Sequence, residues 1–467
     1  MREPTRCASV ATGSVRSPVN FPRRALAALA LLTLLGAAPA QAQGPGGPGP
    51  KVDAALRAKA VGRVGAVLNE VYVFPDVAKK MEAALQRKLK AGAYDKLTTT
   101  AELANALTRD LQEVSKDRHL AVRFAPSMPP GMAPDGPADA ASREALRREL
   151  AQDNFGFERV ERLAGNVGYL DLRSFVGAEL AGETAVAAMQ LLSNTDALIV
   201  DLRKNGGGEP SMIQLLSSYL FDKPTHLNSF YLRKGNVTEQ FWTAAHVAGK
   251  RMSDVPVYVL TSGRTFSAAE EFAYNLKSLE RATIVGETTG GGAHPVEPHF
   301  LADVQLLAFV PFGRAVNPVT GTNWEGVGVK PDVDVPADKA LTAAHLDALR
   351  KLQGQAKDGG QKQGYAWAAQ KVEARTRPAS VPVKLLEGAV GQYGPHTLSY
   401  AEGALWYQWR GDPTRLRALP MTADTLMFED GMDMLRFRLE SNAAGKVTGV
   451  TWLWADGRTE TTPRSEN

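Results

Sequence analysis

The sequence has almost no cysteine, and this scarcity excludes several kinds of chemistry. Cys7 is the single cysteine among 467 residues, and it lies in a leader that we expect to be removed. The remaining chain can then form no disulfide, thiolate–zinc site or cysteine nucleophile. No set of His, Asp and Glu stands at metal-ligand spacing, so the sequence predicts no metal and no cofactor.

An excess of charge of one sign is also missing from most of the chain. The formal net charge is +4, but residues 1–42 hold five arginines and one glutamate. The whole chain has 54 basic and 50 acidic residues, so removal of that leader leaves 49 of each. A formally neutral protein gives no electrostatic reason to expect a nucleic-acid partner.

Long hydrophobic runs are absent as well. The apolar run from Ala25 to Leu35 is too short for a stable membrane span. Arg23 and Arg24 precede it, and the small residues APAQAQ follow it, which is the pattern of a secretory signal. We expect cleavage near Ala42, export to the periplasm or the extracellular space, and no transmembrane span in the mature chain. The alternatives are a membrane anchor and a mis-assigned start.

The length of the chain exceeds what one hydrophobic core supports, so two or three domains are expected. A Gly/Pro-rich lead-in precedes a helical pattern. After the polar stretch 354–364 the sequence changes to short alternating strand patterns separated by turns. The predicted organisation is a signal peptide (1–42), an N-terminal helical domain (43–125), an α/β core (126–353), a linker (354–382) and a C-terminal antiparallel β-sandwich or barrel (383–467). The C-terminal part has no titratable cluster, and its tryptophans are read as core residues rather than as a ligand surface.

Strands and helices alternate in the middle of the chain. Strand patterns are predicted at 167–172, 197–202, 257–260, 282–285, 306–312 and 327–335, with helices at 181–192, 211–221 and 268–279. Such alternation predicts a largely parallel sheet whose functional loops follow the carboxyl ends of the strands.

The stretch TSGRTFSAAEEF places Ser267 where a predicted strand ends and a helix begins. A helix N-terminus presents free backbone N–H groups and partial positive charge. Ser267 could therefore be a nucleophile, with the N–H of Ala268 binding an oxyanion. The alternative is that Ser267 or Thr265 is only an N-cap.

Three glycines, Gly206 to Gly208, follow another predicted strand. No Gly-Lys-Ser/Thr follows them, so they are not a Walker loop. They allow backbone N–H groups to point into a pocket, or they simply form a tight turn.

Five segments in order resemble peptidase family S41. They are VGYLDLRSF, ALIVDLRKNGGG, TSGRTFSAAEEF, IVGETTGGGAHP and NWEGVGVKPDV. The family contains C-terminal processing proteases, the tricorn protease and interphotoreceptor retinoid-binding proteins, and the likeness is nearest to the last branch. It runs from about Lys51 to Asp334. It implies a crotonase/ClpP-like α/β core of stacked ββα units.

The resemblance makes Ser267 the nucleophile. It implies an oxyanion hole formed by the N–H of Ala268 and that of Gly206 or Gly207. Processing proteases pair their serine with a lysine in the stretch that matches GETTGGG, which we call the second Gly-rich segment. This chain has Gly291 there, so a Ser–Lys pair is not expected.

In the tricorn-like branch a histidine is the base and a glutamate orients it, and the matching residues are His119 and Glu325. Arg118 replaces the serine that precedes the tricorn histidine. A carboxylate partner is expected to raise the pKa of His119. Read without the resemblance, His119 beside Asp117 could be a surface ion pair, and Glu325 could cap a turn.

Two more residues of the second Gly-rich segment, Gly291 and His294, are candidates for lining a substrate cleft. The sequence thus predicts an exported serine peptidase that cleaves a peptide or protein substrate by acyl transfer. The rival is a non-catalytic protein that binds a hydrophobic ligand on the same scaffold. A third possibility is an accessory hydrolase that its C-terminal β-domain directs to a partner.

Overall fold

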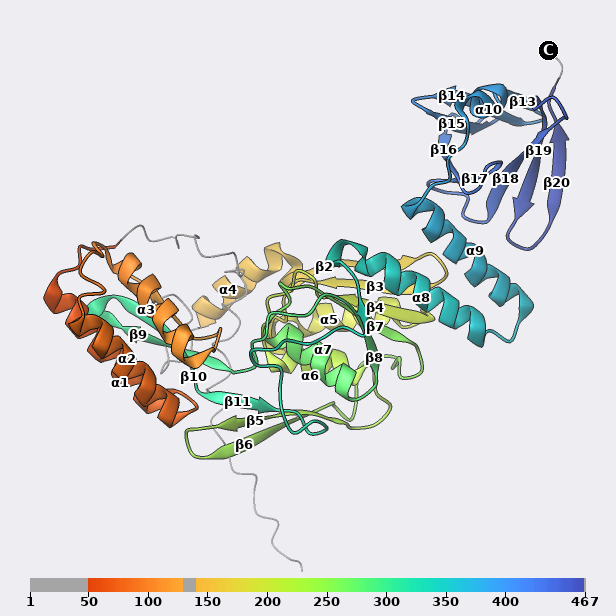
Figure 1. Cartoon of the computed structure of the whole chain (residues 1–467). Coiled ribbons are helices and arrows are strands. Elements are labelled where there is room, and N and C mark those ends of the chain that lie inside the picture. The colour runs from red at the N-terminus through yellow and green to blue at the C-terminus, as the bar shows by residue number, and fades with distance from the viewer. Residues whose placement is uncertain (1–48, 129–139, 466–467) are drawn as a thin grey trace, which may run out of the picture.

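The computed structural model describes residues 49–128 and 140–465. The predicted signal peptide, 1–42, lies outside these residues. Helices α1 to α3 stand at one end of the molecule, a central sheet with helices on both faces follows, and a C-terminal sheet stands at the other end (Figure 1). Among the described helices, none is long and apolar enough to cross a bilayer.

The predicted N-terminal helices are confirmed. They are α1 (Ala54–Val71), α2 (Pro75–Lys90) and α3 (Thr100–Ser115). Thr99 and Glu102 form a capping box, in which the Glu102 carboxylate accepts from the Thr99 N–H and the Thr99 hydroxyl accepts from the Glu102 N–H. Apolar faces of the three helices share one core, which includes Leu68, Met81, Leu85, Leu103, Leu107 and Leu111.

A hairpin from much later in the chain completes this helical core. Strand β1 (Ala121–Phe124) pairs with β10 (Leu306–Pro311), which pairs with β9 (Val296–Leu301), and both pairings are antiparallel. Alternate residues of β10, Leu306 and Ala308 among them, pack against the helices. The predicted domain 43–125 therefore draws part of its core from beyond that range.

The predicted parallel sheet is confirmed in the strand order β12-β8-β7-β4-β3-β2. Its bounds are β2 (Phe157–Leu163), β3 (Val167–Leu172), β4 (Ala197–Asp201), β7 (Val257–Thr261), β8 (Ala282–Gly286) and β12 (Val333–Asp334). All neighbours run parallel except β2 and β3. The carboxyl ends of β4 and β7 therefore lie side by side.

Helices cover both faces of this sheet. They are α5 (Ala178–Leu192), α6 (Pro210–Ser218) and α7 (Ala268–Ser278) on one face, and α8 (Ala340–Gln355) with α9 (Gly359–Thr376) on the other. Leu198 and Val200 of β4 point to the first group, and Ala197 and Ile199 to the second. This alternation is the two-residue period of a strand buried on both faces.

Outside the sheet lie α4 (Ala140–Gln152) and a three-stranded sheet of β11 (Gly313–Val316), β5 (His226–Leu232) and β6 (Val237–Trp242).

The segment predicted as a polar linker, 354–382, is largely helical, so its description as a linker is wrong. Asp358 caps α9 by accepting a hydrogen bond from the N–H of Gln361. Ala368 and Ala369 pack into the core beneath α8. The glycines, lysines and glutamines that suggested a linker occupy the start of the helix, which is exposed, while small alanines make the contact.

The long strand predicted at 327–335 is also wrong, because only β12, Val333–Asp334, forms there. Gly326 and Gly328 both have φ of 71°, in the left-handed region. Left-handed residues interrupt an extended strand, so residues 325–327 form a turn and 328–331 follow as an irregular segment.

The C-terminal region is antiparallel, as predicted. After α10 (Val383–Gly388) come β13 (Gly391–Tyr393), β14 (His396–Ala401), β15 (Ala404–Trp409), β16 (Arg415–Pro420), β17 (Thr425–Phe428), β18 (Leu435–Ser441), β19 (Val447–Trp454) and β20 (Thr459–Pro463). Each strand pairs with the next, and the N–H of Ser465, just after β20, donates to the carbonyl of Gln392 in β13, which nearly closes a barrel. Trp452 is buried in its core but Trp409 is exposed, so the expectation of core tryptophans holds for only some of them.

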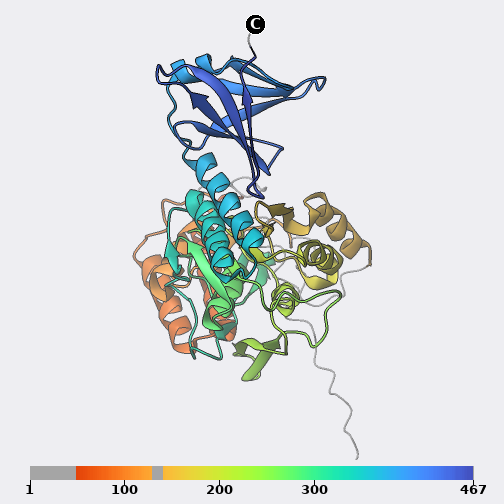
Figure 2. The ribbon, with the colours of Figure 1, turned by 90° about the vertical axis from the view of Figure 1, so that its right-hand side faces the viewer.

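Helix α9 joins this near-barrel to the central body, and both views show the near-barrel standing apart from it (Figure 1, Figure 2). The indole N–H of Trp367 donates to the carbonyl of Asp433, and the guanidinium of Arg436 lies 3.5 Å from the centre of the Trp367 ring. The near-barrel therefore packs against α9 at Trp367, near the middle of the helix.

Candidate active site

Ser267 lies at the carboxyl edge of the sheet, between β7 and α7. The turn that precedes it is fixed to the end of β4 by two hydroxyl groups. Thr265 Oγ1 donates to the carbonyl of Leu202, and Ser262 Oγ donates to that of Arg203. Helix α7 then begins at Ala268, as predicted. The sequence puts Ser267 at this edge because two buried strands end side by side there.

The backbone of Ser267 is strained. Its φ of 56° and ψ of −122° lie outside the regions that L-residues favour. Such strain is concentrated at functional sites, and a serine on a sharp strand-to-helix turn is the arrangement of a nucleophile elbow. Ser267 is half-buried and stands at the N-cap position of α7, but its side chain makes no capping hydrogen bond. The N-cap alternative thus describes the position of Ser267 and leaves its hydroxyl available.

Glu270 joins the Ser267 turn to the second Gly-rich segment, and the sequence analysis missed it. Its buried carboxylate accepts hydrogen bonds from the N–H of Ser267 (2.8 Å), Gly291 (2.6 Å) and Gly292 (2.8 Å), and from the hydroxyl of Thr289. Burial raises the pKa of Glu270 to about 7 although these donors oppose the shift. The capping-box spacing Ser-x-x-Glu was the signal that could have revealed it.

The first Gly-rich segment lies against Ser267. A Cβ on Gly207 would come within 2.8 Å of Ser267 Cβ and 3.1 Å of the Ala268 nitrogen, so only glycine fits there. The Gly207 N–H donates to Asn205 Oδ1 at 2.8 Å and is occupied. In the part of the chain that the structure describes, the N–H groups of Ala268 and Gly206 have no acceptor. Of the three predicted oxyanion donors, Ala268 and Gly206 are thus free to bind.

His119 lies beside the Ser267 turn, in the segment between α3 and β1. Its ring centre is 4.7 Å from that of Phe266, and a Cβ on Gly292 would come within 2.5 Å of its Cε1. No hydrogen bond joins Ser267 to His119, and such bonds often form only when substrate binds. Arg118, the departure from the tricorn pattern, donates from Nη1 to the carbonyl of Gly290 at 2.7 Å and so holds the same segment.

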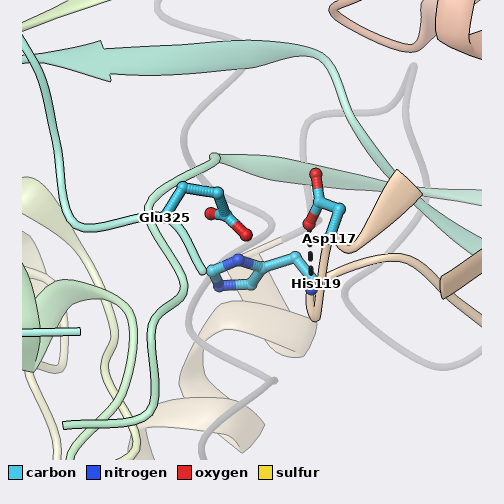
Figure 3. A group of neighbouring side chains, drawn as sticks. All are labelled: Asp117, His119 and Glu325. Atoms are coloured by element: carbon cyan, nitrogen blue, oxygen red, sulfur yellow. Dashed lines mark hydrogen bonds between the residues drawn. The ribbon is translucent and has the colours of Figure 1, made fainter. Parts of the chain in front are cut away.

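Glu325 faces the imidazole of His119 (Figure 3). His119 Nδ1 and Glu325 Oε1 are both buried and have no hydrogen-bond partner among the described residues. Ala293 donates its N–H to the other carboxylate oxygen, Oε2, at 2.6 Å. A small approach of the two side chains would pair the orphaned atoms, which is how a carboxylate orients a catalytic histidine.

Burial sets the protonation of this pair. It lowers the pKa of His119 to about 4, although the charge of Asp117 opposes the shift. The expectation of a raised pKa for His119 was therefore wrong, because desolvation outweighs the carboxylate. Burial and the charge of Asp117 raise the pKa of Glu325 to about 7. Near neutral pH the imidazole is thus ready to accept a proton.

Asp117 is not part of a surface ion pair. It is 1% exposed, and its Oδ2 lies 2.6 Å from Nδ1 of His294. Tyr72 also donates its hydroxyl to Oδ2, and the N–H of His119 donates to Oδ1. His294 and Gly291, which were expected to line a cleft, are both buried. The ring of His294 instead contacts Asp117 and Phe74.

Asp117, His119 and Glu325 also form a cluster whose donor atoms lie within 4.8 Å of one another. Such a set can hold a metal ion, and the sequence spacing did not reveal it. However, both oxygens of Asp117 already accept hydrogen bonds from buried donors. A metal ion bound to this cluster would have to displace those donors.

Comparison with known proteins adds to this geometry. Residues 166–335 match the model of peptidase family S41, and residues 54–154 match that of the N-terminal domain of Peptidase_S41 in eukaryotic IRBP. A carboxy-terminal-processing protease of Bartonella bacilliformis is 27% identical over 198 residues, which cover 37% of this chain and 40% of that protein.

Two solved structures are similar at low identity. The photosystem II D1 C-terminal processing protease has 17% identity and a TM-score of 0.39, covering 61% of this chain and 93% of that one. The tricorn protease has 14% identity and a TM-score of 0.38, covering 62% and 35%. The chain spans about two fifths of the length of the curated relatives that it matches.

Proposed function

This chain belongs to peptidase family S41, and on that premise we propose that it hydrolyses peptide bonds with Ser267 as its nucleophile. The observation that carries the proposal is the strained backbone of Ser267 at the start of α7, next to the free N–H of Ala268. Strain of this kind presents a hydroxyl outward and sets oxyanion donors beside it.

The proposed reaction proceeds by acyl transfer. Ser267 Oγ attacks the carbonyl carbon of the scissile bond, and His119 accepts the hydroxyl proton. The N–H groups of Ala268 and Gly206 bind the oxygen that becomes negative. The intermediate collapses with cleavage of the C–N bond, and His119 returns its proton to the leaving amine. A water molecule then hydrolyses the acyl-enzyme by the same route. Glu325 orients the imidazole and stabilises its protonated form.

Labelling with a fluorophosphonate tests the nucleophile directly. We expect one equivalent of probe to react with the full-length protein and to map to the peptide that contains Ser267, because only an activated serine displaces fluoride. Heat-denatured protein is the control and should not react. A folded protein that resists the probe, or a label on another serine, would favour the ligand-binding alternative.

We also propose that the protein is exported before it acts. The arginines, apolar run and small residues of its first 42 positions support this. Expression of the complete chain in a bacterial host is expected to yield a mature protein that begins near Gln43 in the fraction outside the cytoplasm. Edman sequencing of that protein gives the answer, and recovery of Met1 would disprove export with cleavage.

A further inference from the structure

His294 is enclosed by the two carboxylates of the candidate active site. Its Nδ1 lies 2.6 Å from Asp117 Oδ2 and 3.6 Å from Glu325 Oε2. His294 is 6% exposed and Asp117 is 1% exposed. Because water cannot screen them, these charges act on one another strongly. The proposed reaction uses Glu325 and His119 but gives His294 no part.

The charges around His294 favour its protonated form. Asp117 after α3 and Glu325 before β12 face it with negative charge, while Arg314 of β11 and, when protonated, His119 oppose it. Tyr72 adds a neutral hydroxyl on the far side of Asp117. Burial alone would lower the pKa of His294, but the hydrogen bond and charge of Asp117 outweigh it, so the pKa is raised. The charge of His294 in turn lowers the pKa of Glu325.

We propose that His294 is a second histidine of the active site, a positioning residue that as a cation bound to Asp117 keeps Glu325 ionised beside His119. This inference rests on the proposed function. It explains how two buried carboxylates can stand so close together, since a cation between them offsets their mutual repulsion. It also explains how Glu325 can remain an anion although burial disfavours its charge.

The neighbours of His294 separate its role from that of the base. Phe74 packs edge-on against the ring of His294, with centres 5.6 Å apart. The Nδ1 of His294 is hydrogen-bonded to Asp117. His119 instead contacts Phe266 and approaches Gly292, which adjoin the Ser267 turn. His294 therefore acts through the carboxylates rather than on the substrate.

Substitution by asparagine tests the charge of His294. In His294→Asn the amide can still donate to Asp117, but no cation remains. Without it the pKa values of Glu325 and His119 both rise, so the acid limb of the kcat/KM profile moves to higher pH, by about 1 unit. On the plateau above that limb the loss of kcat/KM is expected to be smaller than at acid pH, because Glu325 is ionised there without the cation. The profiles are measured on one peptide substrate.

His345→Asn is the matched control. His345 is also buried, and within residues 49–128 and 140–465 its side chain hydrogen-bonds only to the carbonyl of Ala164, on the other face of the sheet. We expect no shift of the limb in this variant. A limb that stays in place in His294→Asn would overturn the proposal, because a residue that only packs would lower the rate equally at every pH.

A direct titration separates this inference from the peptidase proposal. In a Ser267→Ala protein with ring-labelled histidines, of which the chain has seven, NMR follows each imidazole. The ring of His294 is expected to remain protonated through the pH range in which an ordinary histidine, with a pKa of about 6.5, loses its proton. Deprotonation of His294 at or below that value would overturn the inference whether or not the wild type cleaves peptides.

Discussion

Ser267→Ala is expected to lower kcat/KM by roughly three or more orders of magnitude, as removal of a triad nucleophile does in other hydrolases. The fold should persist, because this side chain is only half-buried and a lost hydroxyl costs about 1 kcal/mol. The thermal midpoint is therefore expected to move little. Hydrolysis of a peptide or ester substrate and circular dichroism measure the two effects.

Ser193→Ala is the control for loss of a hydroxyl. Ser193 follows α5 and is half-buried like Ser267, and among the described residues its hydroxyl donates only to the carbonyl of Gln190. It should keep full activity. Turnover by Ser267→Ala comparable to that of the wild type would refute Ser267 as the nucleophile, and the non-catalytic alternative would then account better for the scaffold.

His119→Ala is expected to lower kcat/KM by a similar three or more orders of magnitude, since His119 is the base that the proposed reaction assigns to Ser267. The wild-type rate should rise with pH through about 7 and then level. The sign follows from Glu325, whose raised pKa of about 7 means that its negative charge is present only above that pH. His119, with a pKa of about 4, is already neutral throughout this range.

Glu325→Gln identifies the origin of that limb. The variant keeps the shape of the side chain without its charge, so the rise near pH 7 should disappear and the rate should fall by roughly two to four orders of magnitude. The pH–rate profiles of the wild type and both variants on one substrate provide the measurement. An unchanged profile in His119→Ala would remove His119 from the mechanism and make His294 the next residue to test.

The elements that could be predicted are those whose buried residues follow a simple period. The strand at 167–172 was predicted with its observed bounds, and helix α7 within one residue, because local pattern and burial agree there. The linker prediction was wrong because α9 packs through small alanines, which carry little hydrophobic signal. Whether a polar segment of this kind forms a helix depends on its contacts with segments distant in the sequence, which can override local propensity.

The candidate site could be predicted only in part for a related reason. The turn at Ser267 is local, so strand and helix signals located it. The partnership of Asp117 with His294 depends on the hairpin that brings residues near 296 back to α3, and no spacing in the sequence reveals it. Burial also reversed the expected pKa shift of His119, because desolvation depends on neighbours from the whole fold.

The hairpin β9–β10 sets how much of the chain must be synthesised before the proposed active site can form. Val122 of β1 pairs with Ala308 of β10, so the apolar face of the N-terminal helices stays open to water until that late strand has been made. Closing so long a loop costs entropy before any pairing compensates for it, which makes folding slow and the growing chain prone to aggregation. The same closure brings Glu325 to His119. A nascent chain therefore has no complete active site while it is still short, and the peptidase proposed here would begin to cut only after it has folded.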